Sequence, residues 1–334
     1  MSNAIKLTTA EEIRAAVERI GAELEARGGL HSVYCVACGG SLSSAYPPFY
    51  LLRQEARSIH AECMTSNEFC HATPAGCGGN SIVLLMSRAG DTPETVTASK
   101  KARECGASVI TMSILPDAPL KEAADEHFVW AATFKDDYVY SNTAIALRLG
   151  FEILRSFEGY AHFGAAEEAF QKLDRINRAA IEKVRPRAEA WANRYQNESV
   201  IYTMGSGPVH CVAYSACICH LMEMEWIDSA CIHSGDYFHG PFEITDKYVP
   251  FLLFKTSGRP RPLDDRAEAF AKEYTDCLEV VDANDYGASE IDEHVREYFD
   301  SLILFAVGRV YTETLAVYKQ HPFCYRKYMF KEQY

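Results

Sequence analysis

The chain has 334 residues, 48% of them hydrophobic and 24% charged, a composition typical of a soluble globular protein with one large or two medium-sized domains. Its formal net charge of −13 argues against a surface that binds nucleic acid or an anionic membrane, since both would repel an acidic protein. A small anionic substrate is still compatible with this charge, because a helix N-terminus and one or two cations can bind phosphate locally.

Nothing in the sequence predicts a membrane anchor or an oxidising compartment. No apolar run reaches about 18 residues, and the N-terminus lacks the basic-then-apolar order of a signal peptide. Cysteines such as Cys211 and Cys231 lie in apolar runs, where a free thiol behaves as a small hydrophobic group. We therefore expect a cytoplasmic protein. No metal or cofactor is expected, because Cys70, His71 and Cys77 are not followed by a second Cys/His pair at zinc spacing.

Predicted helices and strands alternate along the first half of the chain. A helix over residues 8–28, capped by Thr8 or Thr9, is followed by a strand at 32–37 that runs into a Cys-Gly-Gly-Ser turn. Residues 65–80 read as a polar loop, and the continuous apolar run at 81–86 predicts a strand covered on both faces. The other predicted strands are 58–63, 108–113 and 127–131, and the other helices are those ending near 57 and those at 92–105, 120–126, 140–157 and 165–194.

The second half repeats this pattern from residue 199 onward. A strand enters a small-residue turn at 205–208 and then a helix that contains Ala-Tyr, as in the first half. Later strands are expected at 249–254 and 278–281, with helices at 264–273 and 290–319. The alternation predicts an α/β protein of two doubly wound parallel-sheet (flavodoxin-like) subdomains in tandem, covering residues 1–195 and 196–334.

Turns at the carboxyl ends of two predicted strands have the chemistry to bind phosphate. Ligands of such sheets bind beyond the carboxyl ends of the strands. Ser87, Arg88 and Thr92 offer two hydroxyls and a guanidinium, and a proline at residue 93 makes Thr92 the expected N-cap of the next helix. The glycines of the 38–41 turn let the backbone approach a ligand closely. The alternative for the first turn is an ordinary capped turn with Arg88 in solvent.

A carboxylate and an imidazole 16 positions apart in the second half form a candidate acid/base pair. Glu223 lies in an apolar helical run, where partial burial raises a carboxyl pKa toward useful base strength. His239 lies in a His-Gly-Pro turn, and an imidazole is a suitable acid or base for catalysis. The alternative is that Glu223 merely ends a helix and that His239 is structural. Glu225, which faces differently on the helix, is a competitor for the role of base.

Together these motifs resemble the sugar isomerase (SIS) family, which includes the isomerase half of glucosamine-6-phosphate synthase. Finer features resemble the bacterial fructosamine-6-phosphate deglycases, particularly the fructose-asparagine type, and span residues 36–41, 222–227, 229–235, 238–246 and 326–331. Two positions depart from the family pattern. Ala89 stands where many relatives have a phosphate-binding serine, and Asp236 replaces the usual glutamate of Ser-Gly-Glu.

The resemblance implies a homodimer with a composite active site, in which Glu223 and His239 are catalytic. The residues expected to contact the phosphate or the sugar are Gly39, Gly40, Ser41, Ser87, Arg88, Ala89, Thr92 and Lys331. The expected reaction cleaves a 6-phosphofructose–amino acid adduct, an Amadori product, to glucose 6-phosphate and the free amino acid. A phosphosugar aldose–ketose isomerase, a glucoselysine-6-phosphate-type deglycase and a non-catalytic phosphosugar sensor are the alternatives.

Overall fold

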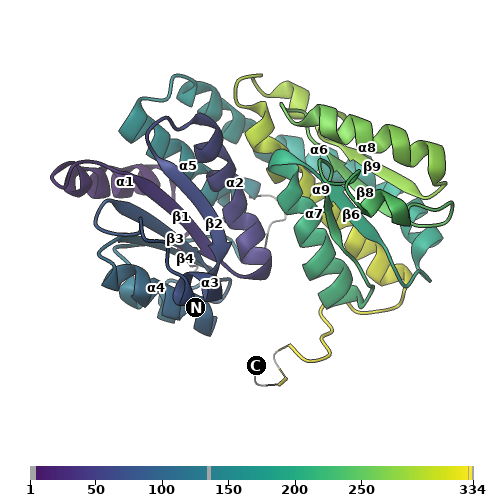
Figure 1. Cartoon of the computed structure of the whole chain (residues 1–334), viewed down its shortest axis with the longest axis horizontal. Coiled ribbons are helices and arrows are strands. Elements are labelled where there is room, and N and C mark those ends of the chain that lie inside the picture. Colours follow the sequence, from purple (N-terminus) through teal and green to yellow (C-terminus); the bar gives the residue numbers. More distant parts are fainter. Residues whose placement is uncertain (1–4, 134–136, 330, 333–334) are drawn as a thin grey trace. The chain divides into compact units, whose positions relative to one another are not determined.

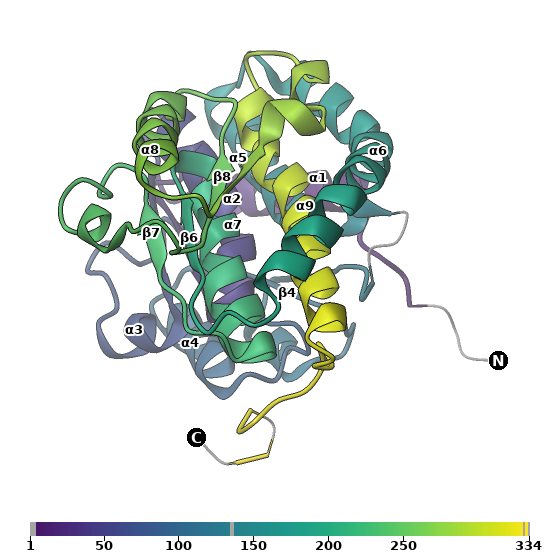
Figure 2. The same cartoon turned by 90° about the vertical axis from the view of Figure 1, so that its right-hand side faces the viewer.

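The computed structural model describes residues 5–133, 137–329 and 331–332 (Figures 1 and 2). It divides into two compact units, Met1–Asp174 and Arg175–Tyr334. Helix α6 (Phe163–Tyr195) begins in the first unit and ends in the second. The expected subdomain boundary after residue 195 falls at the end of this helix and stays a prediction.

The first unit is built around a five-stranded parallel sheet (purple to blue in Figure 1). The strand order β2-β1-β3-β4-β5 is that of a flavodoxin-like sheet, as predicted. Strands β1 and β3 are buried along their whole length because helices cover both faces. The elements are α1 (Ala10–Glu25), β1 (Ser32–Ala37), α2 (Gly39–Glu55), β2 (His60–Thr65), α3 (Ser66–His71), β3 (Ser81–Met86), α4 (Pro93–Glu104), β4 (Ser108–Ser113), β5 (Glu126–Val129) and α5 (Asn142–Glu158).

Alternating side chains of the strands form the core of the first unit. Tyr34 and Val36 of β1 lie on the same face as Val83 and Leu85 of β3, where they join the core beneath α3 and α4. Helices α2 and α5 pack against each other, and α2 also packs on β1 and β2. The first helix is capped as expected, since the Thr9 hydroxyl accepts a hydrogen bond from the amide of Glu12.

The second unit contains a four-stranded parallel sheet with the order β7-β6-β8-β9, which repeats the order of the first four strands of the other sheet. This confirms the predicted tandem of doubly wound sheets. The pair α7 and α9 packs together, and α8 packs on β8 and β9 (Figure 2). The elements are β6 (Tyr202–Gly205), α7 (His210–Ser215), a π-helix (Ala216–Glu225), β7 (Cys231–His233), β8 (Phe251–Lys255), α8 (Arg261–Tyr274), β9 (Leu278–Asp282) and α9 (Arg296–Tyr318).

Two predicted segments are wrong, and one strand was not predicted. Residues 120–126 form only a short 3₁₀ turn (Pro119–Ala123) before β5, since the segment is too short to bury an amphipathic face. The polar loop at 65–80 contains the short helix α3, which Thr65 caps and Phe69 anchors in the core. The strand that was not predicted is β7, which pairs with β6.

Helix α9 is the one helix of the described residues that is long and apolar enough to cross a membrane. More than half of its apolar window (56%) is buried inside the protein. The helix also carries Asp300, which is fully buried and hydrogen-bonded to Thr256 and Ser257. These features are those of a core helix.

Candidate functional site

The turn after β3 presents two hydroxyls at the start of α4. Thr92 is the N-cap residue and Pro93 is the first residue of α4, as predicted, yet the Thr92 hydroxyl makes no capping bond. It lies 2.8 Å from the hydroxyl of the buried Ser87, which accepts a hydrogen bond from the Gly90 amide. Gly90 has φ +73°, and a Cβ there would come within 2.3 Å of the Ala118 Cβ. The turn therefore requires glycine and leaves the N-terminal amides of α4 without a side-chain cap.

Arg88 and Ala89, the other two predicted residues of this turn, offer fewer contacts for a phosphate than the sequence suggested. Arg88 is exposed, and one of its guanidinium nitrogens lies 3.4 Å from the carbonyl oxygen of Ala132. Ala89 is partly buried and contributes no side-chain donor. A phosphate in this turn would be bound mainly by hydroxyls and backbone amides, with Arg88 able to reach it from the surface.

The Cys-Gly-Gly-Ser turn lies beside the Ser87 turn because β1 and β3 are neighbours in the sheet, with Ala37 in register with Met86. This pair of strand ends is the switch point of a flavodoxin-like sheet, where ligands bind. Helix α2 begins at Gly39, whose φ of +54° favours glycine, and Cys38 supplies no side-chain cap. Within the described ranges, the Ser41 hydroxyl has no hydrogen-bond partner. The two turns thus place Gly39, Gly40, Ser41, Ser87 and Thr92 at neighbouring strand ends, and their role in binding a ligand stays a prediction.

The equivalent strand ends of the second unit are occupied by the protein's own carboxylates. After β8, Asp300 accepts hydrogen bonds from the Thr256 hydroxyl and from both the amide and the hydroxyl of Ser257, at 2.6–2.7 Å. Asp264 likewise accepts from the hydroxyls of Ser206 and Ser234 and from the Thr256 amide. These carboxyl groups take the donors that a bound phosphate would need. Among the described residues, no carboxylate binds the hydroxyls at the switch point of the first unit, where Ser87 and Thr92 bond each other.

Glu223 lies in the last turn of the π-helix. Such helices are rare and cluster at functional sites, because the wider turn displaces side chains from their α-helical directions. The helix ends at Glu225, and Trp226 then adopts a left-handed conformation with φ +57°. The Glu223 carboxylate receives a hydrogen bond of 2.6 Å from Nε of Arg326, a residue of the C-terminal tail, and its side chain is 23% exposed. The sequence analysis included Arg326 in the motif at 326–331 but did not predict its contact with Glu223, because no local pattern links residues so far apart in the chain.

Glu225, the competing carboxylate, is only 2% exposed, and neither of its oxygens has a hydrogen-bond partner among the described residues. Burial raises its pKa to about 7, with the positive charge of Lys319 acting in the opposite direction. Glu225 is thus poorly placed to reach a substrate, whereas Glu223 is partly open to solvent. The geometry favours Glu223 as the base.

His239 lies on an exposed loop after β7, and Gly240 beside it has φ +132°. Tyr237 anchors the loop in the core, because its side chain is fully buried and its hydroxyl lies 2.5 Å from that of Thr245. The backbone amide of His239 donates to the carbonyl of the exposed Asp236. No hydrogen bond or ion pair joins His239 to Glu223 in the part of the chain that the structure describes. Their meeting in one active site stays a prediction.

Lys331 lies in the tail with its ammonium 2.5 Å from the carbonyl oxygen of Arg326 and 4.6 Å from the centroid of the Tyr325 ring. Both contacts lie within the tail. A role for Lys331 in binding the phosphate or the sugar stays a prediction.

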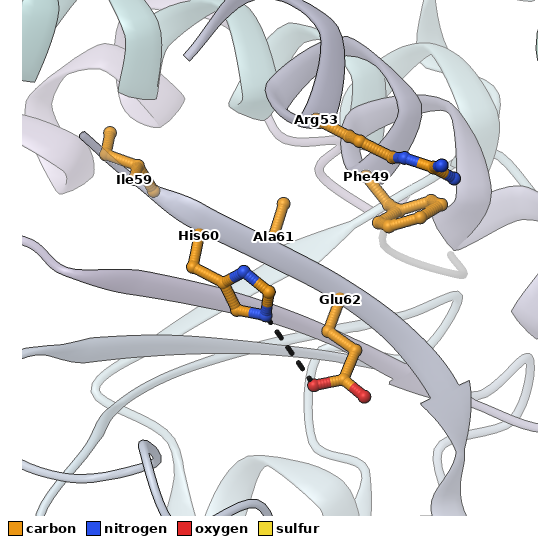
Figure 3. Close-up of a pocket in the computed structure, with 6 residues that line it drawn as sticks. All are labelled: Phe49, Arg53, Ile59, His60, Ala61 and Glu62. Carbon is orange, nitrogen blue, oxygen red and sulfur yellow. Dashed lines mark ion pairs between the residues drawn. The ribbon is translucent and has the colours of Figure 1, made fainter. Parts of the chain in front are cut away.

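One hollow of about 520 Å³ lies over the edge strand β2 (Figure 3). In it His60 and Glu62 face each other at 3.9 Å, below side chains of α2. No predicted site residue is part of its lining, which consists of Phe49, Arg53, Ile59, His60, Ala61 and Glu62. We do not assign the substrate to it.

Comparison with known proteins agrees with this arrangement. The family model described as the SIS domain matches residues 30–148, which include both turns of the first unit. The chain is 40% identical over 304 residues to fructosamine deglycase FrlB of Bacillus subtilis (strain 168), covering 90% of this chain and 92% of that protein. The chain belongs to the SIS-domain family.

Two further relatives extend the likeness of this SIS-domain protein. It is 25% identical over 297 residues to the fructoselysine 6-phosphate deglycase of Escherichia coli (strain K12), covering 89% of this chain and 84% of that one. A solved structure of a candidate phosphosugar isomerase from Salmonella typhimurium LT2 has a TM-score of 0.92 and 40% identity, covering 96% of this chain and 99% of that one. Both SIS-type units therefore have counterparts in relatives of the same length.

Proposed function

We propose that this SIS-domain protein is a deglycase that cleaves a 6-phosphofructose–amino acid adduct to glucose 6-phosphate and the free amino acid. The observation that carries the proposal is the 40% identity to a fructosamine deglycase across 90% of the chain. The site supports it independently, since hydroxyls and backbone amides lie at the switch point of the first sheet and a partly exposed carboxylate, Glu223, lies in a π-helix of the second unit. We further propose that the reaction takes place in the cytoplasm.

In this mechanism the 6-phosphate binds to Ser41, Ser87, Thr92 and the adjoining amides, which fixes the sugar. His239 moves a proton at the ring oxygen and opens the ring. Glu223 then abstracts a proton from C1, which gives an enaminol, and protonation at C2 yields an imine between C1 and nitrogen. Water adds to the imine and releases the amine. Positioned acid/base groups typically contribute about 10²–10⁴-fold each.

We also propose that the active enzyme is a homodimer whose active site is completed by the second copy. The exposed position of His239 supports this, because its imidazole meets no acid/base partner among the described residues of its own chain. A residue contributed to a neighbour's site has to lie on the surface of its own subunit.

The test is release of glucose 6-phosphate from a panel of 6-phosphorylated fructose–amino acid adducts, measured with a coupled dehydrogenase. Glu223→Gln and His239→Ala should each abolish turnover while the circular dichroism spectrum stays that of the folded protein. Wild-type rates in either variant would refute the assigned pair. A protein that interconverts fructose 6-phosphate and glucose 6-phosphate but leaves the adducts intact would be an isomerase instead.

A further inference from the structure

The ion pair between Arg326 and Glu223 joins the C-terminal tail to the proposed base. Both side chains are largely shielded, with 13% of Arg326 and 23% of Glu223 exposed. Nη1 of Arg326 donates to the carbonyl oxygens of Phe323 and Tyr325, so the guanidinium is anchored to the tail that carries it. Its remaining nitrogen, Nη2, has no partner within the described residues. A donor is therefore available right beside the proposed base.

Among the described residues, no carboxylate other than Glu223 forms an ion pair with this guanidinium. Burial raises the pKa of the Cys219 thiol to about 12, so the thiol is neutral. Burial also lowers the pKa of His220 to about 3, so this imidazole carries no charge either. The tail is held against the π-helix by ring contacts, with Trp226 4.7 Å from His321 and 5.4 Å from Tyr325 between ring centroids. Arg326 is thus held at the base by packing around it.

A carboxylate bound to a guanidinium is a weak proton acceptor, because the positive charge favours its ionised form. A base held in this way is released only if another anion takes over the guanidinium. Arginine binds carboxylates in a two-pronged geometry, which makes a second carboxylate a suitable competitor.

The chemistry of the substrate supplies such an anion at the right distance. In an α-amino acid adduct, C1 is joined to the amino acid carboxyl carbon by three bonds of about 1.5 Å each, so the two lie within about 4 Å. The base has to reach the C1 proton at hydrogen-bond distance. A guanidinium beside the base is therefore also beside this carboxylate, whereas the 6-phosphate is at the other end of the sugar.

We propose that Arg326 binds the α-carboxylate of the amino acid that is later released. The substrate carboxylate replaces Glu223 as the partner of the guanidinium, so that Glu223 becomes free to act as the base only when an amino acid adduct is bound. This inference rests on the proposed deglycase function. It makes Arg326 the residue that selects amino acid adducts over adducts of simple amines and over unsubstituted fructose 6-phosphate.

The experiment compares substrates with and without the carboxylate. The 6-phosphofructose adducts of asparagine and glycine are each paired with their decarboxylated counterparts, the adducts of 3-aminopropanamide and methylamine. The kcat/KM ratio within each pair is measured for the wild type, Arg326→Gln, Arg326→Lys and the control Lys327→Gln, which removes an exposed charge from the next position of the tail.

Arg326→Gln should reduce this ratio about 10- to 100-fold, the effect of one charge-assisted hydrogen-bonded contact. Arg326→Lys should restore part of it, and Lys327→Gln should leave it unchanged. A purely structural role would lower activity on both members of a pair equally.

The two proposals fail in different ways. If the wild type releases glucose 6-phosphate from the adducts but Arg326→Gln leaves the ratio unchanged, the role of Arg326 is wrong and the deglycase function stands. If the wild type acts on none of the adducts, the function itself is wrong, and the role of Arg326 with it.

Discussion

The buried carboxylate of Glu225 predicts a stability that falls as the pH rises. Its pKa is raised by burial from 4.5 to about 7, and neither oxygen has a hydrogen-bond partner among the described residues. Below pH 4.5 the group is protonated in the folded and unfolded states, so it costs nothing. Between these values the unfolded chain loses the proton and the folded protein keeps it. Because each pH unit corresponds to about 1.4 kcal/mol, the free energy of unfolding should fall by about 2–3 kcal/mol between pH 5 and pH 8.

Glu225→Gln tests this, because the amide has the size and the neutrality of the protonated acid. Urea unfolding at pH 5 and pH 8 gives the free energy of unfolding for the wild type, the variant and Glu243→Gln, a control at an exposed glutamate. Between pH 5 and pH 8, the free energy of unfolding of Glu225→Gln should rise by about 2–3 kcal/mol relative to that of the wild type. That of Glu243→Gln should not change relative to the wild type. An equal difference between variant and wild type at both pH values would show that Glu225 is ionised in the folded protein, and the reasoning from burial would fail.

Two further predictions concern the turn at the end of β3. Ser87→Ala removes the hydroxyl that binds Thr92 and Gly90, and should raise KM for the phosphorylated substrate about tenfold in steady-state assays, with the exposed Thr97→Ala as its control. Gly90→Ala places a Cβ 2.3 Å from that of Ala118 at a φ of +73°. It should lower the melting temperature in scanning calorimetry and weaken inhibition by inorganic phosphate; unchanged values for both would mean that the turn tolerates a side chain.

The sequence was most informative where the physical signal is local. The apolar run at 81–86 predicted β3 to the residue, because a strand buried on both faces has to be apolar throughout. Thr92 and Pro93 were identified as the start of α4 from the residue types that a helix N-terminus accepts. The two turns of the first unit follow from these elements, since adjacent parallel strands end at the same edge.

Longer-range features were not accessible in this way. The helix expected at 120–126 is a 3₁₀ turn, because a helical pattern over a few residues does not outweigh the adjacent strand. Strand β7 is only three residues long and exists because β6 lies next to it. The π-helical form of residues 216–225 left no sign in the apolar pattern, which reads like any helix.

The sequence by itself determined most of the strands and helices, the family that the chain resembles, and the residues of the two turns at the switch point of the first sheet. Only the tertiary structure decided which of two nearby glutamates is open to solvent. It also decided that Asp264 and Asp300 bind the hydroxyls at the strand ends of the second unit. It alone brought Arg326 to Glu223. The reason is that backbone preferences act over a few neighbouring residues, whereas burial and charge pairing depend on groups that meet only when the chain has folded.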